Sequence, residues 1–139
     1  MSEMTVQHIL VAIDFGSASR SALEYGAGLA GNLGATLHVV HVTDADHADS
    51  SHERARLEAF LTSLATVTTR VVILKSARPA AALIAYARAE QIDLIVAGTG
   101  GRERSRDILD FFMGSVAQNL VRNAPCPVMT MRAPVVAAA

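Results

Sequence analysis

Short runs of apolar residues, many of them β-branched, recur five times along the chain and alternate with longer amphipathic segments. The runs are HILVAI, TLHVVHV, RVVILK, DLIVAG and PVMTMR, at residues 8–13, 36–42, 70–75, 93–98 and 127–132. Nearly continuous apolar runs of this length are typical of parallel strands that helices cover on both faces. The alternation therefore predicts an α/β fold, an open five-stranded parallel sheet with helices on both faces and right-handed crossovers.

The spacing of apolar residues between these runs predicts the helices. Gly34 follows the first helical segment, about 18–33, and is predicted to cap its C-terminus, whereas Pro79 suits the first turn of a later helix. The predicted apolar stripes are Ala22, Tyr25, Gly26, Leu29, Ala30 and Leu33; then Leu57, Phe60, Leu61 and Leu64; then Ala80, Leu83, Ile84 and Ala87; and finally Val116, Leu120 and Val121.

The chain length and the lack of a long apolar run predict the domain number and the location of the protein. A chain of 139 residues fits one domain, which we expect to span 1–139 with a core at about 7–132 and a frayed tail at 133–139. No apolar run approaches the roughly 20 residues that span a bilayer, and no export signal is seen at the start. The lone Cys126 agrees with a reducing compartment, so we expect a soluble cytoplasmic protein.

Charge argues against nucleic acid and membrane partners. Twelve basic and thirteen acidic residues are interspersed and give a net charge of −1, so no broad attraction to polyanions is expected. Lys75 is the only lysine, and no phosphate-binding G-x-x-x-x-G-K-[ST] motif occurs. Any phosphate contact is therefore expected from arginine or from backbone N–H groups.

Four further features suggest chemistry, and three of them have a simpler structural interpretation. GAGLAG at 26–31 matches the dinucleotide fingerprint, yet it lies about three turns into a helix instead of at a strand-to-helix turn, so close helix packing is the better interpretation. The His- and Asp-rich segment 41–52 lacks the spacing of a dedicated metal site and suits turns and caps. Cys126, between two prolines, is predicted to pack as a small apolar residue, and for His8 and His38, within strands, a catalytic role is only a weak hypothesis.

The loops after the strands are the expected place for a ligand, because open parallel sheets bind at the carboxyl ends of their strands. Asp14 follows the first run, at the end of the predicted strand, where its carboxylate could accept hydrogen bonds from a ribose or an adenine, or could equally orient the next turn or cap the following helix. If the first and fourth strands are neighbours, Asp14 and the loop that begins at Gly98 flank one crevice.

The loop itself, GTGGRERSRDILDFFMGS at 98–115, has glycines at both ends. Gly98, Gly100 and Gly101 allow close approach of backbone to a ligand, and Gly114 with Ser115 precedes a helix whose free N–H groups favour an anion. Ser115 can either donate to a phosphate or cap that helix. We interpret this stretch as a phosphate site, with a plain glycine-bounded loop as the alternative.

On these residues the chain resembles the universal stress protein family. The resemblance covers about 7–132 and is carried by HILVAIDFGSASRSAL, LHVVHV, DLIVAGTGGR and, most specifically, GSVAQNLVRNAPCPVMTMR. It implies a Rossmann-like, adenine nucleotide alpha hydrolase-like sandwich with strand order 3-2-1-4-5. It further implies a homodimer whose last strands, about 127–132, meet, and a regulatory role in stress survival.

The resemblance also implies the ligand and its contacts. The ligand would be ATP or ADP, with Mg²⁺ or Mn²⁺ held by its phosphates. Twelve residues separate Gly101 from Gly114, where nine are usual, and Gly100 replaces a common histidine. Little or no hydrolysis is expected; the alternatives are a dimeric interaction module that binds no nucleotide and has an unidentified protein partner, and a slow ATPase. The contacts are implied for Asp14 at the ribose or adenine, Val42 and Ala97 at the base, and Gly98, Gly101, Gly114 and Ser115 at the phosphates.

Overall fold

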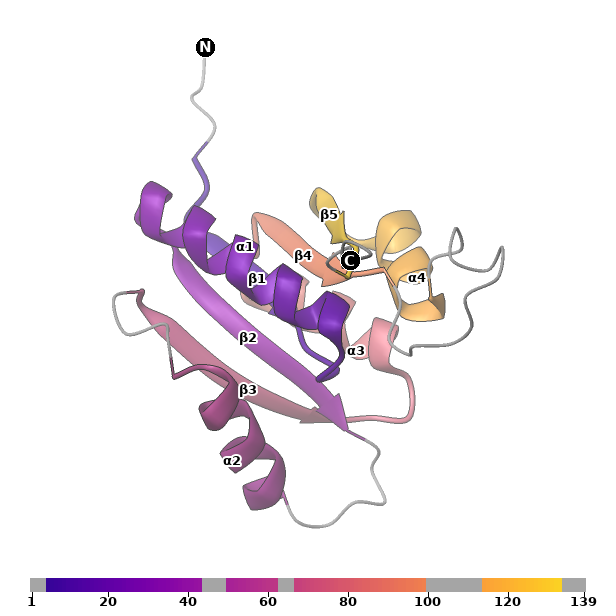
Figure 1. The fold of residues 1–139 in the computed structure, drawn as a ribbon. Coiled ribbons are helices and arrows are strands. Elements are labelled where there is room, and N and C mark those ends of the chain that lie inside the picture. The colour runs from indigo at the N-terminus through magenta and orange to yellow at the C-terminus, as the bar shows by residue number, and fades with distance from the viewer. Residues whose placement is uncertain (1–4, 44–49, 63–66, 100–113, 134–139) are drawn as a thin grey trace, which may run out of the picture.

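The sheet has the predicted number of strands, direction and order. The computed structural model describes residues 5–43, 50–62, 67–99 and 114–133, without the side chains of 50–53. All neighbouring strands are parallel, in the order β3-β2-β1-β4-β5 (Figure 1). The strands are β1 (His8–Ala12), β2 (Thr36–Thr43), β3 (Thr69–Lys75), β4 (Leu94–Gly98) and β5 (Val128–Met131).

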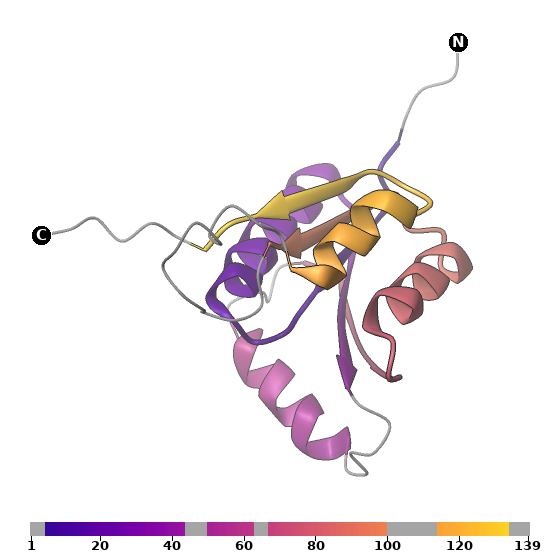
Figure 2. The same ribbon diagram turned by 90° about the vertical axis from the view of Figure 1, so that its right-hand side faces the viewer.

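Two layers of helices enclose the sheet. In the described ranges these are α1 (Ser17–Leu33), α2 (Ser50–Phe60), α3 (Pro79–Ala89) and α4 (Ser115–Asn123). The pair α1 and α2 packs on one face, and α3 and α4 pack on the other (Figures 1 and 2). Of these helices, none combines the length and the apolar composition needed to cross a bilayer.

The core forms one apolar cluster on each side of the sheet because successive strand residues point to opposite faces. On β1, Ile9 and Val11 pack toward α1, whereas Leu10 packs toward α3. All three side chains are fully buried. This two-sided burial explains why the strands are apolar without alternation.

Helix α1 approaches the sheet closely through its small residues. A Cβ atom built at Gly26 would lie 2.5 Å from Cγ2 of Val11, so Gly26 permits the contact between helix and strand. The packing interpretation of GAGLAG is therefore confirmed at Gly26, whereas Gly28 is exposed and makes no such contact. The predicted stripe was too wide, since Tyr25 and Leu33 are 47% and 52% exposed. Tyr25 lies about 100° around the helix from Gly26, and Leu33 is the last helical residue.

The other helix ends largely agree with the predicted signals. Gly34 adopts the left-handed conformation, with φ 68°, and caps α1, while Pro79 begins α3. Helix α4 starts at Ser115, one residue before the predicted start, and its Val121 is 51% exposed rather than part of the apolar stripe. Leu64 and the tail 134–139 lie outside the described residues.

The strand order reverses between β1 and β4. Chain connections leave these two neighbours in opposite directions, β1 toward β2 and β4 toward β5. Their carboxyl ends, with Ala12 paired to Ala97, are therefore the place where open parallel sheets bind ligands.

Candidate functional site

Asp14 follows β1 and organises the turn into α1. Its Oδ1 accepts a hydrogen bond from the Gly16 N–H at 2.9 Å and one from the Ser19 hydroxyl at 2.5 Å. The N-cap position of α1 belongs to Gly16 and has no side-chain hydrogen bond, so Asp14 orients the turn without acting as the cap itself. The Asp14 residue is exposed, and within the described part of the chain no hydrogen bond to its Oδ2 is found. A ligand could therefore still reach this carboxylate.

Gly98, at the end of β4, lies directly against the first turn of α1. A Cβ atom there would come within 2.8 Å of the Ala18 Cβ and 2.9 Å of the Ala18 carbonyl carbon. The absence of a side chain at Gly98 is thus explained by helix packing, independently of any ligand. The end of β4 is therefore in contact with the helix that follows β1.

A backbone hydrogen bond joins the two ends of the glycine-bounded loop. The Thr99 N–H donates to the Met131 carbonyl at 2.8 Å, which continues the pairing of β4 with β5. The Gly114 N–H in turn donates to the Thr99 carbonyl at 2.5 Å. The start of α4 is therefore held at the end of β4, and Asp14, Gly98 and Gly114 lie along one edge through a chain of direct contacts.

Helix α4 points its N-terminus toward this edge. Gly114 is its N-cap, with φ −64° and ψ 164°, and no side chain caps it. The capping alternative for Ser115 is therefore wrong: Ser115 is the first helical residue, and it is exposed. The first N–H groups of a helix have no acceptor within it, so this end favours an anion.

Of the remaining predicted site residues, the structure describes Val42 and Ala97 but not Gly101. Val42 lies near the end of β2, half-buried, and Ala97 is 3% exposed in β4; both pack in the cluster beneath α3 and α4. Gly101 lies outside the described residues, as do Gly100 and the rest of the loop through 113. Asp44, Asp46 and His47 of the His- and Asp-rich segment are outside them too.

An aromatic group beside Asp14 was not predicted. Phe15 has a positive φ of 68°, and its ring lies 4.8 Å from that of His41 between ring centroids. The Arg56 guanidinium stands over the Phe15 ring at 4.1 Å, which links α2 to the β1 turn. No sequence pattern indicates this turn, because positive φ is usual for glycine and rare for phenylalanine.

A cavity of about 480 Å³ lies at the opposite, amino-terminal edge of the sheet. Its lining includes His8, Arg88, Gln91 and Asp93, and none of the predicted site residues. Asp93 Oδ2 there accepts hydrogen bonds from the N–H groups of Gln7 and His8. This carboxylate is therefore engaged in aligning the start of β1, and we place the candidate site at the carboxyl edge.

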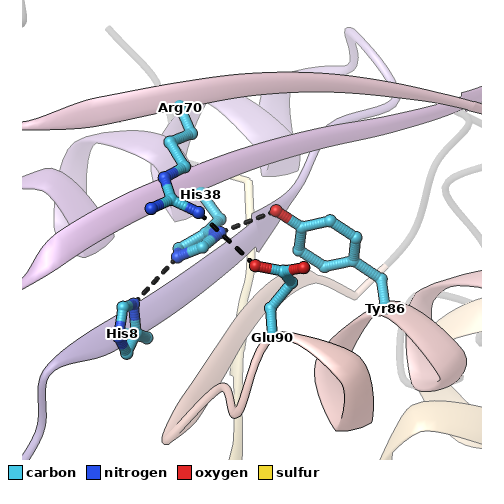
Figure 3. A network of polar contacts seen from close by, with 5 residues as sticks. All are labelled: His8, His38, Arg70, Tyr86 and Glu90. Atoms are coloured by element: carbon cyan, nitrogen blue, oxygen red, sulfur yellow. Dashed lines mark hydrogen bonds and ion pairs between the residues drawn. The ribbon is translucent and has the colours of Figure 1, made fainter.

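His38 is the fully buried member of a polar network near that cavity (Figure 3). Its Nε2 is hydrogen-bonded to His8 Nδ1 at 3.1 Å, and its Nδ1 to the Tyr86 hydroxyl at 2.7 Å. Arg70 and Glu90 form an ion pair at 3.4 Å alongside. The network lies at the end of the sheet opposite Asp14, which separates both histidines from the candidate site.

Burial lowers the pKa of His38, and the nearby charges of His8 and Arg70 lower it further, while Glu90 opposes them. Burial is also the main reason that the pKa of Tyr86 is raised. The folded protein therefore keeps His38 neutral at pH values where the unfolded chain, with a histidine pKa of about 6.5, binds a proton.

We accordingly expect the free energy of unfolding to fall as the pH drops below about 6.5. One histidine contributes at most about 1.4 kcal/mol per pH unit. Urea unfolding at pH 8, 7, 6 and 5 should show a smaller acid loss for His38→Gln, whose amide does not titrate. Equal pH profiles for the two proteins would contradict this assignment.

The described residues contain neither an activated cysteine nor a cluster of metal ligands. Burial, followed by the charge of Asp93, raises the pKa of the Cys126 thiol, which agrees with its packing beside the α3–α4 cluster. Among the side chains the structure describes, no three His, Cys, Asp or Glu residues gather as a metal site.

Comparison with known proteins gives one family. Residues 5–132 match the model of the universal stress protein family. A curated universal stress protein of Thermus aquaticus is 39% identical over 80 residues, which are 58% of this chain and 55% of that protein. The match thus spans about half the length of this curated relative.

Solved structures agree in fold. A universal stress protein of Lactobacillus plantarum superposes with a TM-score of 0.80 at 22% identity, covering 94% of this chain and all of that one. One from Archaeoglobus fulgidus, solved in complex with dAMP, gives 0.70 at 21% identity, with 92% and 99% covered. One from Arabidopsis thaliana, solved with AMP bound, gives 0.65 at 19% identity, with 93% of both chains covered.

Proposed function

Because this chain belongs to the universal stress protein family, we propose that it binds an adenine nucleotide, ATP or ADP, at the carboxyl edge of its sheet. The bound nucleotide makes the protein a regulatory module in a cytoplasmic stress response. We propose that little or no hydrolysis accompanies binding.

The observation that carries the proposal is the contact chain along this edge. Gly98 touches the first turn of α1, and the Thr99 carbonyl accepts the N–H of Gly114. An exposed carboxylate, Asp14, and a helix N-terminus therefore stand on the same edge at the reversal of strand order. A carboxylate for hydroxyl or amino groups beside N–H groups for phosphate matches the two ends of a nucleotide.

Each predicted residue then has a role. Asp14 accepts hydrogen bonds from the ribose or the base, and Val42 and Ala97 border the base. The four phosphate-side residues are Gly98, Gly101, Gly114 and Ser115. Mg²⁺ or Mn²⁺, where present, is held by the phosphates themselves.

The nucleotides bound by structural neighbours support the ligand class. The neighbours from Archaeoglobus fulgidus and Arabidopsis thaliana hold dAMP and AMP, and a further universal stress protein was solved in complex with cAMP. All three ligands contain adenine and a phosphate. We extend this class to ATP and ADP for the present chain.

The proposal includes an assembly. We propose that residues 1–139 act as a single domain and pair as a homodimer through β5, one of the two edge strands of the sheet, at about 127–132. An edge strand offers unpaired N–H and C=O groups for such a contact. An additional protein partner would receive the nucleotide signal.

Calorimetry tests the function directly. The protein is first unfolded and the released material chromatographed for adenine nucleotide; apo protein is then titrated with ATP, ADP and GTP. We expect micromolar binding of ATP and ADP, weaker binding of GTP, and no phosphate release above background with or without Mg²⁺. The matched variant is Asp14→Asn, whose Oδ1 still accepts from Gly16 and Ser19 but which lacks the charge.

Three results would count against parts of the proposal. Absence of both released nucleotide and binding heat at high micromolar ATP would remove it and leave the interaction module. Phosphate release that Ser115→Ala abolishes would instead support the ATPase. Unchanged affinity in Asp14→Asn would exclude a charged contact from Asp14.

A further inference from the structure

Ser19 has a buried hydroxyl whose two hydrogen bonds both go to Asp14. The residue is 2% exposed in the first turn of α1. Its Oγ accepts from the Asp14 backbone N–H at 2.9 Å and donates to the Asp14 Oδ1 at 2.5 Å. One side chain therefore fixes both the backbone and the carboxylate of Asp14.

Only a hydroxyl satisfies both groups in this position. Serine Oγ carries one donor and two acceptor sites, whereas alanine has neither and a cysteine thiol is weak at both. The Oδ1 atom also accepts from the Gly16 N–H at 2.9 Å, so this oxygen is directed into the protein. A carboxylate held through one oxygen by two donors has little rotational freedom.

Ser19 also borders the other half of the edge. A Cβ atom at Gly98 would lie 3.0 Å from the Ser19 backbone nitrogen, so β4 ends against this residue. Through Thr99, the same strand end holds Gly114 at the start of α4. Ser19 thus contacts Asp14 on one side and the strand that leads to the phosphate loop on the other.

We propose that Ser19 is a positioning residue for the nucleotide, an inference that rests on the proposed function. It keeps the Asp14 carboxylate in one rotamer and in a fixed place relative to Gly98. Oδ1 is used internally, which reserves Oδ2 for the ligand. The nucleoside contact and the phosphate contacts are then preorganised together, so that little side-chain entropy is lost on binding.

The first experiment measures the position of Asp14 without ligand. Three-bond couplings between Hα and Hβ of Asp14, measured by NMR, should report a single staggered rotamer in the natural protein. Ser19→Ala should give averaged couplings, whereas Ser17→Ala, an exposed serine of the same turn, should leave them unchanged. Averaged couplings in the natural protein, or unchanged couplings in Ser19→Ala, would overturn the positioning role.

The second experiment is a double-mutant cycle on ATP affinity with Ser19→Ala, Asp14→Ala and the combined variant. We expect Ser19→Ala alone to weaken binding about tenfold, the size of a lost hydrogen bond to a charged group. In the Asp14→Ala background the same change should matter less than about twofold, because there is no carboxylate left to position.

The possible outcomes distinguish the positioning role of Ser19 from the proposed nucleotide binding. Equal losses in both backgrounds mean that Ser19 is merely structural, and no loss in either means that it is irrelevant; both overturn the inference. Failure of the natural protein to bind ATP removes the proposed function, while the NMR couplings still decide whether Ser19 positions Asp14. If Ser19→Ala does not fold, Ser19→Cys replaces it, with an intermediate effect expected in both experiments.

Discussion

Replacing Gly98 with alanine is expected to lower the free energy of unfolding by about 2 to 3 kcal/mol and to remove nucleotide binding. The added methyl group would lie 2.8 Å from the Ala18 Cβ, 2.9 Å from the Ala18 carbonyl carbon and 3.0 Å from the Ser19 nitrogen. Two of these atoms belong to the backbone of α1 and cannot rotate away. The helix or the strand end must therefore move, and with it the spacing between Asp14 and the phosphate loop.

Gly28→Ala is the matched control, because it adds the same methyl group at an exposed position of α1, where nothing beyond the adjoining backbone of the helix lies within 4 Å. Alanine is the better helix former, so this variant should be more stable by roughly 0.8 kcal/mol. Urea unfolding curves measure both changes, and calorimetry with ATP measures the affinity of each variant. If the free energies of unfolding of Gly98→Ala and of the natural protein differ by less than about 0.5 kcal/mol, Gly98 does not lie in close contact with α1.

The strands could be predicted within about one residue because each is a short apolar run buried on both faces. For instance, residues 36–42 were predicted as a strand, and β2 covers Thr36–Thr43. Helix ends were predictable where one residue dictates the backbone, as at Gly34 and Pro79. Tyr25 and Leu33 were misassigned because periodicity describes the helix but not how much of its surface the sheet covers.

Only part of the candidate site could be predicted from the sequence. The position of Asp14 at a strand end and of Gly114 before a helix follows from local pattern, and the strand order came from a family resemblance that the structure confirms. The role of Gly98 against α1 depends on tertiary distance, which no local pattern contains. The same holds for Ser19, whose partner is set by a turn in which Phe15 has a positive φ.

Replacing Gly114 with valine is expected to abolish ATP binding while the fold remains. Gly114 has φ −64° and ψ 164°, a conformation open to any residue, and its N–H would still donate to the Thr99 carbonyl. Valine is a poorer N-cap, so the stability cost should be about 1 kcal/mol. The branched side chain, however, would stand where the phosphates approach the first N–H groups of α4. We expect affinity to fall by more than about a hundredfold.

Asn119→Val is the matched control, since it places the same side chain on an exposed position one turn further along α4. It should bind ATP as the natural protein does. Comparison with Gly98→Ala then distinguishes two causes of lost binding: a displaced strand end reduces affinity and stability together, whereas an obstructed phosphate site reduces affinity almost alone. Normal ATP affinity in Gly114→Val would place the nucleotide away from the N-terminus of α4, because no phosphate can share that space with a valine side chain.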